Sequence, residues 1–362
     1  MALIEYASRT VPKLVEKSVN SFYNADPLLK KLLDKNQVKQ TGGSSIKMVR
    51  IKSGHSDLVE INSSNISVPL VKRDTFGSLT GDWARFVKPV IIPHVDRDRA
   101  ADPAEAKRLV QDTVTAAMTD TRNRVLRQIY TGSEATLKGL GSLNGSPNAG
   151  GFSTGTSTGL ENGALYFGTP TEQASAATPY LGQARLEDTT NFEDNWHNQY
   201  KVCTVGSSFL KTLEELKLMA DSYADNEGIS LGICSNSTLV EIGAEARAYP
   251  GASGNATALV YSVDDVEKGK IHPSITVYNG VMFHPNRYMA AATTTTYGEN
   301  NAVYLLNPND ISWWVNAGNS FRSTKFFDGL STSNIDADIS YIILECQLVV
   351  NNLLTQACTS HA

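Results

Sequence analysis

Residues 102–132 read DPAEAKRLVQDTVTAAMTDTRNRVLRQIYTG, and this stretch predicts a single long helix with both ends marked. Asp102 is a suitable N-cap, Pro103 fits the first helical position, and Glu105 completes a capping box. Gly132 can end the helix in a left-handed turn. At about 1.5 Å per residue the helix would be roughly 40 Å long, which suits a spine on which flanking elements are mounted.

One narrow side of this predicted helix is apolar and carries mostly small side chains. Its members recur at spacings of three and four residues and are Ala106, Val110, Val114, Ala117, Met118, Thr121, Val125 and Ile129. Charged residues such as Lys107, Asp112 and Arg124 fall elsewhere on the helical wheel. We therefore expect this stripe to be buried and the rest of the helix to be polar and exposed.

Two short amphipathic segments precede the strands that lead to this helix. Apolar residues at helical spacing mark the first segment from Val11 to Phe22, and Asp26-Pro27 is a start signal for the second. Two arrangements of residues 1–40 are open. They form a helical hairpin packed on its own domain, or an arm laid on a neighbouring subunit.

From Gly42 to Pro93 the periodicity becomes strand-like. The nearly alternating segments SIKMVRIKSG, DLVEINS, ISVPLVKRD and DWARFVKPVIIPHV are separated by turn residues, which predicts antiparallel strands. Polar side chains are dense between the apolar ones, so such a sheet has little to bury on its second face. We expect this sheet to pack against a companion domain of the same chain or against another copy of the chain.

A tract rich in Gly, Ser, Thr and Asn follows the long helix over residues 133–198. It contains seven acidic and two basic residues, and so accounts for the whole formal net charge of −5. Its aromatic and leucine residues could form a small hydrophobic core. This favours a surface insertion with short strands over an unstructured linker. Its glycine spacing matches no nucleotide-binding fingerprint.

The remainder of the chain has a mixed helix and strand pattern. TLEELKLMADSYADN predicts a helix, ISLGICSN a strand, and STLVEIGAEARAYP a second helix that begins at Ser237. HPSITVYNG, VMFHPNRYM, TTTTYG and AVYLLNPND then predict strands, and ISYIILECQLVVNNLLTQA predicts a central strand that continues to the end. Trp313 and Trp314 are adjacent, so the two indoles are expected to point to opposite faces, with core and interface roles both open.

Composition limits the classes of function. A chain of 362 residues with 41% hydrophobic content can bury the core of one large domain or of two to three modest ones. The net charge of −5 disfavours a general nucleic-acid binder, because polyanion binding needs clustered Lys and Arg. Cys203, Cys234, Cys346 and Cys358 show no CxxC spacing, so we expect buried or idle thiols. No segment has the length and apolar character of a signal peptide or membrane span, which predicts a protein made in the cytosol.

The sequence contains no HExxH zinc-protease motif, and its six histidines stand singly. One cluster nevertheless suggests a metal site. His94, Asp96 and Asp98 have an HxDxD spacing that could place metal ligands on one side of an extended chain. Arg97 and Arg99 are interleaved, however, and can neutralise both carboxylates.

The order of these parts resembles that of tailed-bacteriophage major capsid proteins, whose shell fold encapsulins share. The resemblance rests on the N-terminal segment, the hairpin, the long helix and, after it, IYTGSEATLKGLGSLNG with its Gly139-Leu140 step. It continues in TLEELKLMADSYADNEGISLGICSNSTLVEIGAEAR, KGKIHPSITVYNGVMFHPNRYM and ISYIILECQLVVNN. Two features depart from the family pattern. The Gly/Ser/Thr-rich tract is long, and no charged scaffolding segment precedes the arm, which implies a separate scaffold or none.

The resemblance implies an α+β protein with the phage major-capsid fold in four parts. These are an N-terminal arm (1–43), an extended β-hairpin loop (44–100), a peripheral domain (101–210 and 331–362) that carries the spine helix (102–132) and an insertion (133–198), and an axial α/β domain (211–330).

The resemblance also implies a structural role without catalytic, cofactor-binding or metal sites. The chain would be the major capsid protein that self-assembles, as hexamers and pentamers, into the icosahedral head enclosing the genome of a tailed bacteriophage. Expected partners are other copies of the chain, a separate scaffolding protein and a portal, with double-stranded DNA enclosed non-specifically and no membrane. The expected location is the virion capsid, after synthesis in the host cytoplasm. Some relatives crosslink their subunits, but Lys47, Lys52 and Lys72 are expected to be ordinary solvated lysines.

Three other functions remain open from the sequence. An encapsulin-like compartment shell is the nearest variant. An α/β enzyme with a lid insertion is a hypothesis of a different class, motivated by His94, Asp96 and Asp98. A surface-binding β module is a third, motivated by the Thr/Ser/Gly tract.

Overall fold

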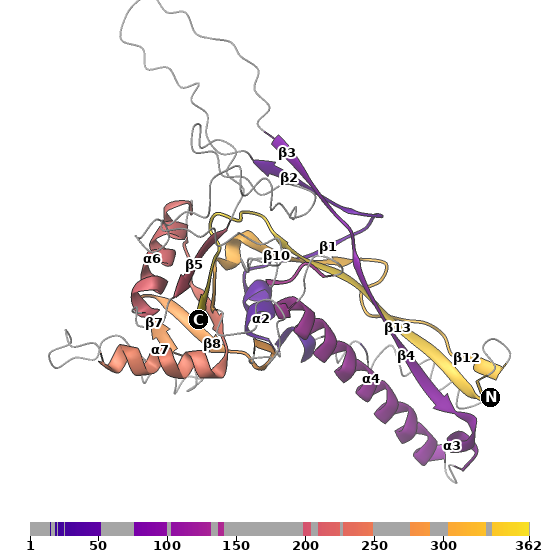
Figure 1. Cartoon of the computed structure of the whole chain (residues 1–362). Coiled ribbons are helices and arrows are strands. Elements are labelled where there is room, and N and C mark those ends of the chain that lie inside the picture. Colours follow the sequence, from indigo (N-terminus) through magenta and orange to yellow (C-terminus); the bar gives the residue numbers. More distant parts are fainter. Residues whose placement is uncertain are drawn as a thin grey trace, which may run out of the picture. The chain divides into compact units, whose positions relative to one another are not determined.

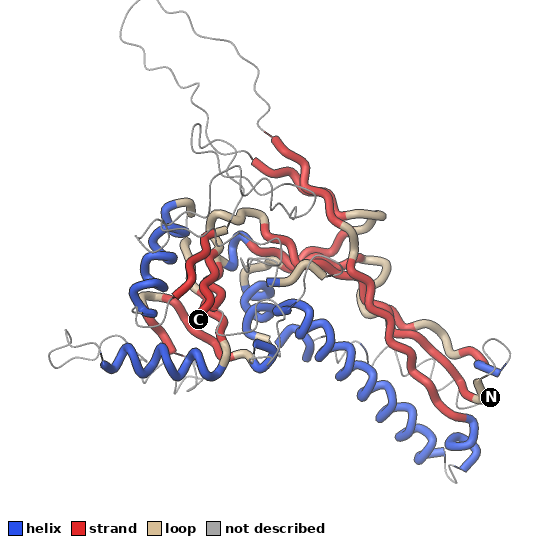
Figure 2. Tube along the Cα trace, viewed as in Figure 1, coloured by secondary structure: helices blue, strands red, loops and turns tan. Residues whose placement is uncertain are grey.

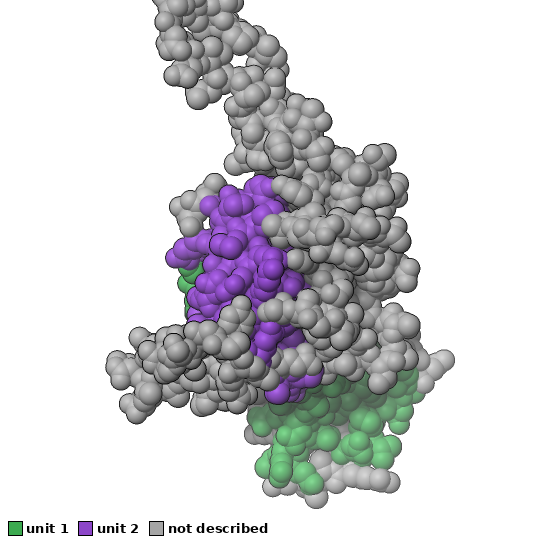
Figure 3. Space-filling view, turned by 60° about the vertical axis from the view of Figure 1, so that its left-hand side comes forward, with its two compact units in different colours: residues 1–44, 83–139, 311–349 green, residues 45–82, 140–310, 350–362 purple. Residues whose placement is uncertain are grey.

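The structure is a computed structural model, and its fold is seen in Figures 1 and 2. It divides into two compact units, coloured in Figure 3: unit 1 is residues 1–44, 83–139 and 311–349, and unit 2 is residues 45–82, 140–310 and 350–362. Both units combine helices with a sheet, as the α+β class predicts. The described residues are 15, 19, 21–24, 26–51, 76–99, 103–131, 137–140, 198–203, 209–224, 227–248, 276–289, 303–330 and 335–361.

The predicted long helix is confirmed as α4 (Pro103–Thr131), with Pro103 as its first residue. The expected stripe is buried, because Val110, Val114, Ala117, Met118, Thr121, Val125 and Ile129 all lie in the core of unit 1. Leu126 and Tyr130 widen the buried side beyond the prediction. Asp102, Gly132 and the side chain of Ala106 lie outside the described residues.

The sheet of unit 1 is organised around the long strand β13, and α4 runs alongside β4 in Figures 1 and 2. β4 pairs with β13 antiparallel, and so do the short strands β11 and β12. β10 is the other neighbour of β13, and β1 adds to β10 in parallel. The bounds of these strands are β1 (Val38–Thr41), β4 (Ala84–Pro93), β10 (Ile311–Asn316), β11 (Arg322–Ser323), β12 (Phe327–Asp328) and β13 (Ala337–Val350).

The described part of the N-terminal segment packs on its own unit. Phe22 is buried, and its ring centroid lies 5.3 Å from that of Phe321 and 6.5 Å from that of Trp313. α2 (Pro27–Asp34) begins after the N-cap Asp26 and buries its leucines Leu28, Leu29 and Leu32. Of the two arrangements that the sequence left open, the described residues of this segment follow the one in which the apolar side chains pack on their own unit.

The expected antiparallel hairpin is present as a two-stranded sheet of β2 (Ile46–Ile51) and β3 (Phe76–Gly81). The predicted strands DLVEINS and ISVPLVKRD lie outside the described residues. The segment DWARFVKPVIIPHV does not extend this hairpin. It supplies β4 in the sheet of unit 1 and then α3 (His94–Arg99).

Unit 2 contains a six-stranded sheet in the order β5-β14-β9-β6-β8-β7. The pairs β5–β14 and β6–β8 are parallel, and the remaining pairs are antiparallel. The Asn279-Gly280 turn between β7 and β8 has positive φ at both residues, as a tight hairpin turn requires. The strand bounds are β5 (Gln199–Cys203), β6 (Leu231–Cys234), β7 (Thr276–Tyr278), β8 (Val281–Pro285), β9 (Val303–Leu306) and β14 (Ala357–His361).

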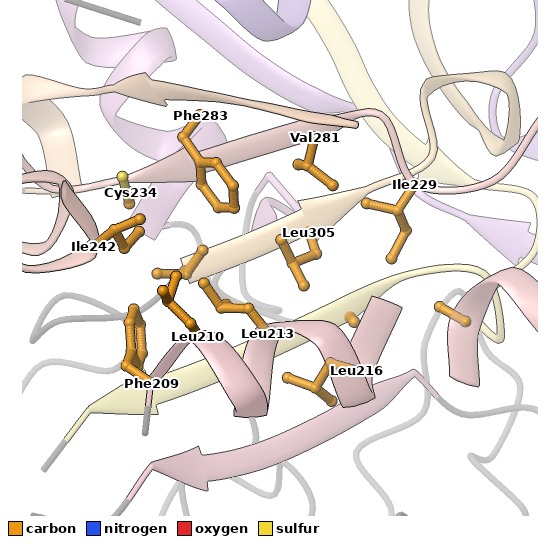
Figure 4. Close-up of a cluster of buried hydrophobic side chains, with 13 residues drawn as sticks. Phe209, Leu210, Leu213, Leu216, Ile229, Cys234, Ile242, Val281, Phe283 and Leu305 are labelled. Atoms are coloured by element: carbon orange, nitrogen blue, oxygen red, sulfur yellow. The ribbon is translucent and has the colours of Figure 1, made fainter. Parts of the chain in front are cut away.

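Two predicted helices, α6 (Phe209–Ser222) and α7 (Asn236–Ala248), complete unit 2 with the 3-10 turns η2 (Arg287–Met289) and η3 (Pro308–Asp310). Figure 4 shows their shared core, in which α6 leucines meet apolar side chains of the strands. Glu245 of α7 accepts hydrogen bonds from the backbone N–H groups of Phe209 and Leu210, and so caps α6. α7 starts before the predicted Ser237, because Ser235 accepts a hydrogen bond from the N–H of Thr238 at 3.2 Å.

The C-terminal run is two strands in two sheets, so the prediction of one continuous strand is wrong. β13 ends at Val350, and β14 begins at Ala357 in the sheet of unit 2. The break has a local cause at Asn352, whose side-chain oxygen accepts a hydrogen bond from the N–H of Leu354 at 3.1 Å. Such a bond folds the backbone into a turn and ends the strand.

Some predictions fall on parts of the chain that are not described. The tract 133–198 lies outside the described residues apart from 137–140 and 198, and TTTTYG lies outside them entirely. Among the helices that are described, none is both long enough and apolar enough to cross a membrane.

Candidate assembly surface

One face of the β4–β13 pair is turned away from α4. Lys88 of β4 reaches Asp120 of α4 at 2.8 Å, so the even-numbered residues of β4 face that helix. The odd-numbered Val87 and Ile91 point the other way, and they are 49% and 41% exposed. Two large apolar side chains are thus left at the surface of one strand.

Neighbouring strands extend this apolar face. Residues opposite each other in an antiparallel pair share a face, so Tyr341 and Ile343 of β13 lie beside Pro89 and Val87. Phe327 of β12 also joins them, with its ring centroid 5.8 Å from that of Tyr341. We define the outer sheet face as Val87, Pro89, Ile91, Phe327, Tyr341 and Ile343.

The free edge of β4 is unsuited to strand pairing. Among the described strands β4 pairs with β13 alone, so it is an edge strand of the described sheet. Pro89 and Pro93 lack the N–H group that a further strand would need, and proline within sheets is confined to such edges and strand ends. Contacts with another molecule here would therefore use side chains of the face rather than backbone groups of the edge.

A charged pair borders the apolar residues at one end of the face. Arg85 and Glu345 are directly opposite in the β4–β13 register, and their side chains form an ion pair at 3.4 Å. Glu345 also accepts a hydrogen bond from the side chain of Asn316 at 2.9 Å. The apolar residues of the face thus end in polar groups on one side, and protein interfaces likewise combine an apolar centre with a polar rim.

The Gly139-Leu140 step has a packing reason in unit 1. A Cβ atom at Gly139 would lie 2.3 Å from the carbonyl oxygen of Gln128, in the last turns of α4. The N–H of Lys138 donates to the side chain of Gln347 at 2.8 Å, which holds this segment against β13. Only glycine allows the chain to pass so close to the end of the helix.

No protein-family model matches this sequence, and no curated protein matches it. The capsid of cyanophage A-1(L) matches with a TM-score of 0.53 and 12% identity, over 92% of this chain and 92% of that chain. The capsid of the empty GTA particle matches with a TM-score of 0.52 and 10% identity, over 92% of this chain and 90% of that chain. The SrpI encapsulin of Synechococcus elongatus matches with a TM-score of 0.50 and 11% identity, over 91% of this chain and 86% of that chain. This chain has the fold of phage capsids and encapsulins.

The capsid-shell fold confirms the fold class that the sequence predicted. These structural neighbours are parts of shells, none of them described as an enzyme. Sequence reasoning did not single out the outer sheet face, although a signal was present. The alternation in RFVKPVIIP, with two prolines in one strand, marks an edge strand with one uncovered side.

The capsid-shell fold does not bring the suggested metal ligands together. The ring nitrogens of His94 lie next to Asp336 and Asp338, at 2.6 and 3.3 Å, rather than next to Asp96. Asp96 is exposed, and the side chain of Asp98 lies outside the described residues. Among the residues that are described, no group of His, Cys, Asp and Glu could hold a metal ion.

The tryptophan pair divides between the two faces of β10, as expected. Trp313 is fully buried, whereas Trp314 is half-buried and its ring nitrogen donates to the hydroxyl of Ser312 at 2.8 Å. The ammonium group of Lys39 lies 5.6 Å from the Trp314 ring centroid, within range of a cation–π contact. Trp313 is therefore a core residue, and the ring of Trp314 is contacted by Lys39 and Ser312 of the same chain.

The thiols are buried as expected in the part of the chain that is described. Cys234, Cys346 and Cys358 are free and buried, while the side chain of Cys203 lies outside the described residues. Burial raises the pKa of Cys234 to about 12 and also raises the pKa values of the Cys346 and Cys358 thiols. Of the three hairpin lysines, Lys47 is exposed, and Lys52 and Lys72 lie outside the described residues.

Proposed function

We propose that this chain is a major capsid protein that self-assembles into the icosahedral head of a tailed bacteriophage. The observation that carries the proposal is the capsid-shell fold, which the capsids of a cyanophage and of a GTA particle match over 92% of this chain. Its role would be structural, without catalysis.

The outer sheet face supports this proposal physically. Val87 and Ile91 are too exposed for residues of a finished core, and no charge separates them on their face of β4. Full burial of a valine or isoleucine side chain contributes about 1.5–3 kcal/mol. If identical chains each offer this face to a different surface of the next copy, every copy gains the same contact, and a shell results when the geometry closes.

The proposal includes the expected organisation and partners. The chain would comprise the arm, the extended hairpin loop, the peripheral domain with its insertion, and the axial domain. It would form hexamers and pentamers, with a separate scaffolding protein and a portal as partners. The acidic net charge of −5 suits enclosure of double-stranded DNA without adhesion to it, because like charges repel. Synthesis would take place in the host cytoplasm, and the final location would be the virion.

Assembly of the purified chain is the direct test. We would express the full chain alone and together with a candidate scaffolding protein, separate the products by size-exclusion chromatography, and image them by negative-stain electron microscopy. Closed icosahedral shells are the expected result. Only monomers or small closed oligomers, under every assembly condition tried, would overturn the proposal.

An encapsulin-like compartment is a second candidate, and the match to the SrpI encapsulin supports it. The contents of the shell distinguish the two. Particles isolated from the native host would contain DNA protected from nuclease if they are phage heads. Particles with an enriched protein cargo and no protected DNA would instead establish the compartment.

A further inference from the structure

His94 lies where several elements of unit 1 converge. It follows the last residue of β4 and is the first residue of α3, and β12 and the start of β13 lie at the same end of the sheet (Figure 1). Its side chain is only 16% exposed. The ring therefore occupies a largely enclosed position at the junction of four elements.

Three carboxylates face this ring. Nδ1 lies 2.6 Å from Oδ1 of Asp336, and Nε2 lies 3.3 Å from Oδ1 of Asp338. Asp328 of β12 is the third, with Oδ1 3.9 Å from Nε2. Both ring nitrogens thus point at acceptors. Asp336 and Asp338 lie at the start of β13, and Asp328 is the last residue of β12.

The protonation state of the ring decides how many of these contacts are hydrogen bonds. A neutral imidazole carries one N–H group, so it can donate to Asp336 or to Asp338 but not to both. The imidazolium carries two N–H groups and a positive charge, and it satisfies both carboxylates at once. Without that charge, the aspartates around the ring would repel one another.

No described residue within two positions of His94 in the chain is basic. β4 ends here with the uncharged residues Ile92 and Pro93, and Asp96 of α3 is acidic and exposed. The side chains of Arg97 and Arg99 lie outside the described residues.

Backbone contacts link this ring to the fold of the junction. The N–H of His94 donates to the carbonyl of Asp336, and the N–H of Ile335 donates to the carbonyl of Gly329. Gly329 is packed so closely that a Cβ atom there would lie 2.7 Å from the carbonyl oxygen of Ala337. A change in the hydrogen bonds of the ring should therefore affect both the start of α3 and the backbone around Gly329 and Ala337.

We propose that the ring of His94 is a proton-dependent clamp that fastens α3 and β12 to the start of β13. The clamp is complete while the imidazole is protonated and the aspartates are ionised. It is lost as rising pH removes the ring proton, and it is also lost in acid that protonates the carboxylates. This property belongs to a single chain, so it does not depend on shell assembly.

Hydrogen exchange of the full chain, followed by mass spectrometry, tests this proposal. A series from about pH 5 to about pH 9.5 lowers the fraction of rings that carry the second proton. After correction for intrinsic exchange, we expect protection of residues 94–96, 327–330 and 335–338 to fall about tenfold over this series. Peptides from the core of unit 2 provide the internal reference.

Variants separate the clamp from general effects of pH. His94→Gln should abolish the pH dependence at the junction. Asp336→Asn should reduce it, and the fold should tolerate this change because the Asp336 side chain is 60% exposed. The matched control is His284→Gln, another half-buried histidine beside a proline, which should leave the dependence unchanged. Equal pH dependence in the wild type and in both junction variants would overturn the proposal, as would a wild type with no dependence.

Discussion

The carboxylate of Asp26 ties the N-terminal segment of unit 1 to its long helix. It is 2% exposed and accepts hydrogen bonds from the backbone N–H groups of Leu28 and Leu29, at 3.0 and 3.2 Å. The hydroxyl of Tyr130, near the end of α4, donates to the same carboxylate, with 2.7 and 2.8 Å to its two oxygens. A buried charge is tolerated only when it is hydrogen-bonded in this way.

Removal of the Tyr130 hydroxyl should destabilise unit 1. We expect Tyr130→Phe to lower the free energy of unfolding of the unassembled chain by about 1.5–3 kcal/mol, because a hydrogen bond to a charged group is lost. Urea denaturation monitored by circular dichroism measures this. Tyr288→Phe is the control, since the Tyr288 hydroxyl contacts the exposed side chain of Arg287. Similar stability losses in the two variants would contradict the role given to Asp26.

The buried thiols should resist modification in the folded chain. With the pKa of Cys234 raised to about 12, roughly one thiol in 100,000 is ionised near pH ~7, and the thiolate is the reactive form. We expect a Cys203→Ser variant, which retains only Cys234, Cys346 and Cys358, to react with a maleimide only after unfolding in denaturant. Mass spectrometry counts the labels. Complete labelling of the folded chain within minutes would refute the assignment.

At the scale of the element, the close approach of Gly139 to α4 makes a sharp prediction. A Cβ atom there would also lie 2.4 Å from the carbonyl oxygen of Ile129, and backbone atoms of a helix cannot move aside as a flexible side chain can. We expect Gly139→Ala to cost about 1–3 kcal/mol of folding free energy, measured by chemical denaturation.

Gly42→Ala is the matched control for this substitution. A Cβ atom at Gly42 would meet nothing within 4 Å, so the stability should change by less than about 0.5 kcal/mol. If Gly139→Ala were as harmless as Gly42→Ala, the close packing of this segment on the helix would be refuted.

Local signals in the sequence predicted elements well, but they did not predict which strands would pair. The period of Val110, Val114 and Ile129 is a property of one helix, and the Asn279-Gly280 turn is a property of two residues, so both were readable. The pairing of β4 with β13 joins residues far apart in sequence, and no local period encodes it. The same limit hid the outer sheet face, which exists only because Tyr341 comes to lie beside Pro89.

The N-terminal segment is a second case in which sequence patterns did not predict tertiary contacts. Its apolar residues were evident, yet the sequence left open whether Phe22 would pack on its own unit or on a neighbouring subunit. The answer depends on Phe321 and Trp313, which stand almost three hundred residues later in the printed sequence. The order of the predicted elements indicated the fold through its resemblance to capsid proteins. Which apolar residues are buried and which are exposed depends on tertiary contacts.

At the scale of the whole molecule, the outer sheet face predicts how assembly can be blocked without unfolding the chain. We expect the double variant Val87→Asp and Ile91→Asp to fold, because both side chains are more than 40% exposed. Burial of two carboxylates in an apolar contact is strongly unfavourable, so the protein concentration needed for assembly should rise at least about tenfold. Light scattering and negative-stain microscopy measure that threshold.

A matched pair of substitutions controls for added charge. Leu218 and Val240 are exposed apolar residues on α6 and α7 of unit 2, 66% and 67% exposed. Leu218→Asp with Val240→Asp adds the same charge to residues that are not part of the outer sheet face, and the assembly threshold should stay near that of the wild type. An unchanged threshold for the Val87 and Ile91 variant would exclude this face as a contact between copies.

The two prolines of β4 have a consequence for the direction in which aggregates of this chain can grow. An edge that kept all its amide groups would let chains add one after another through their backbones, as in an amyloid ribbon that never ends. Pro89 and Pro93 interrupt that hydrogen-bonding row. We therefore expect this edge of β4 not to start fibres through its backbone, even at high protein concentration.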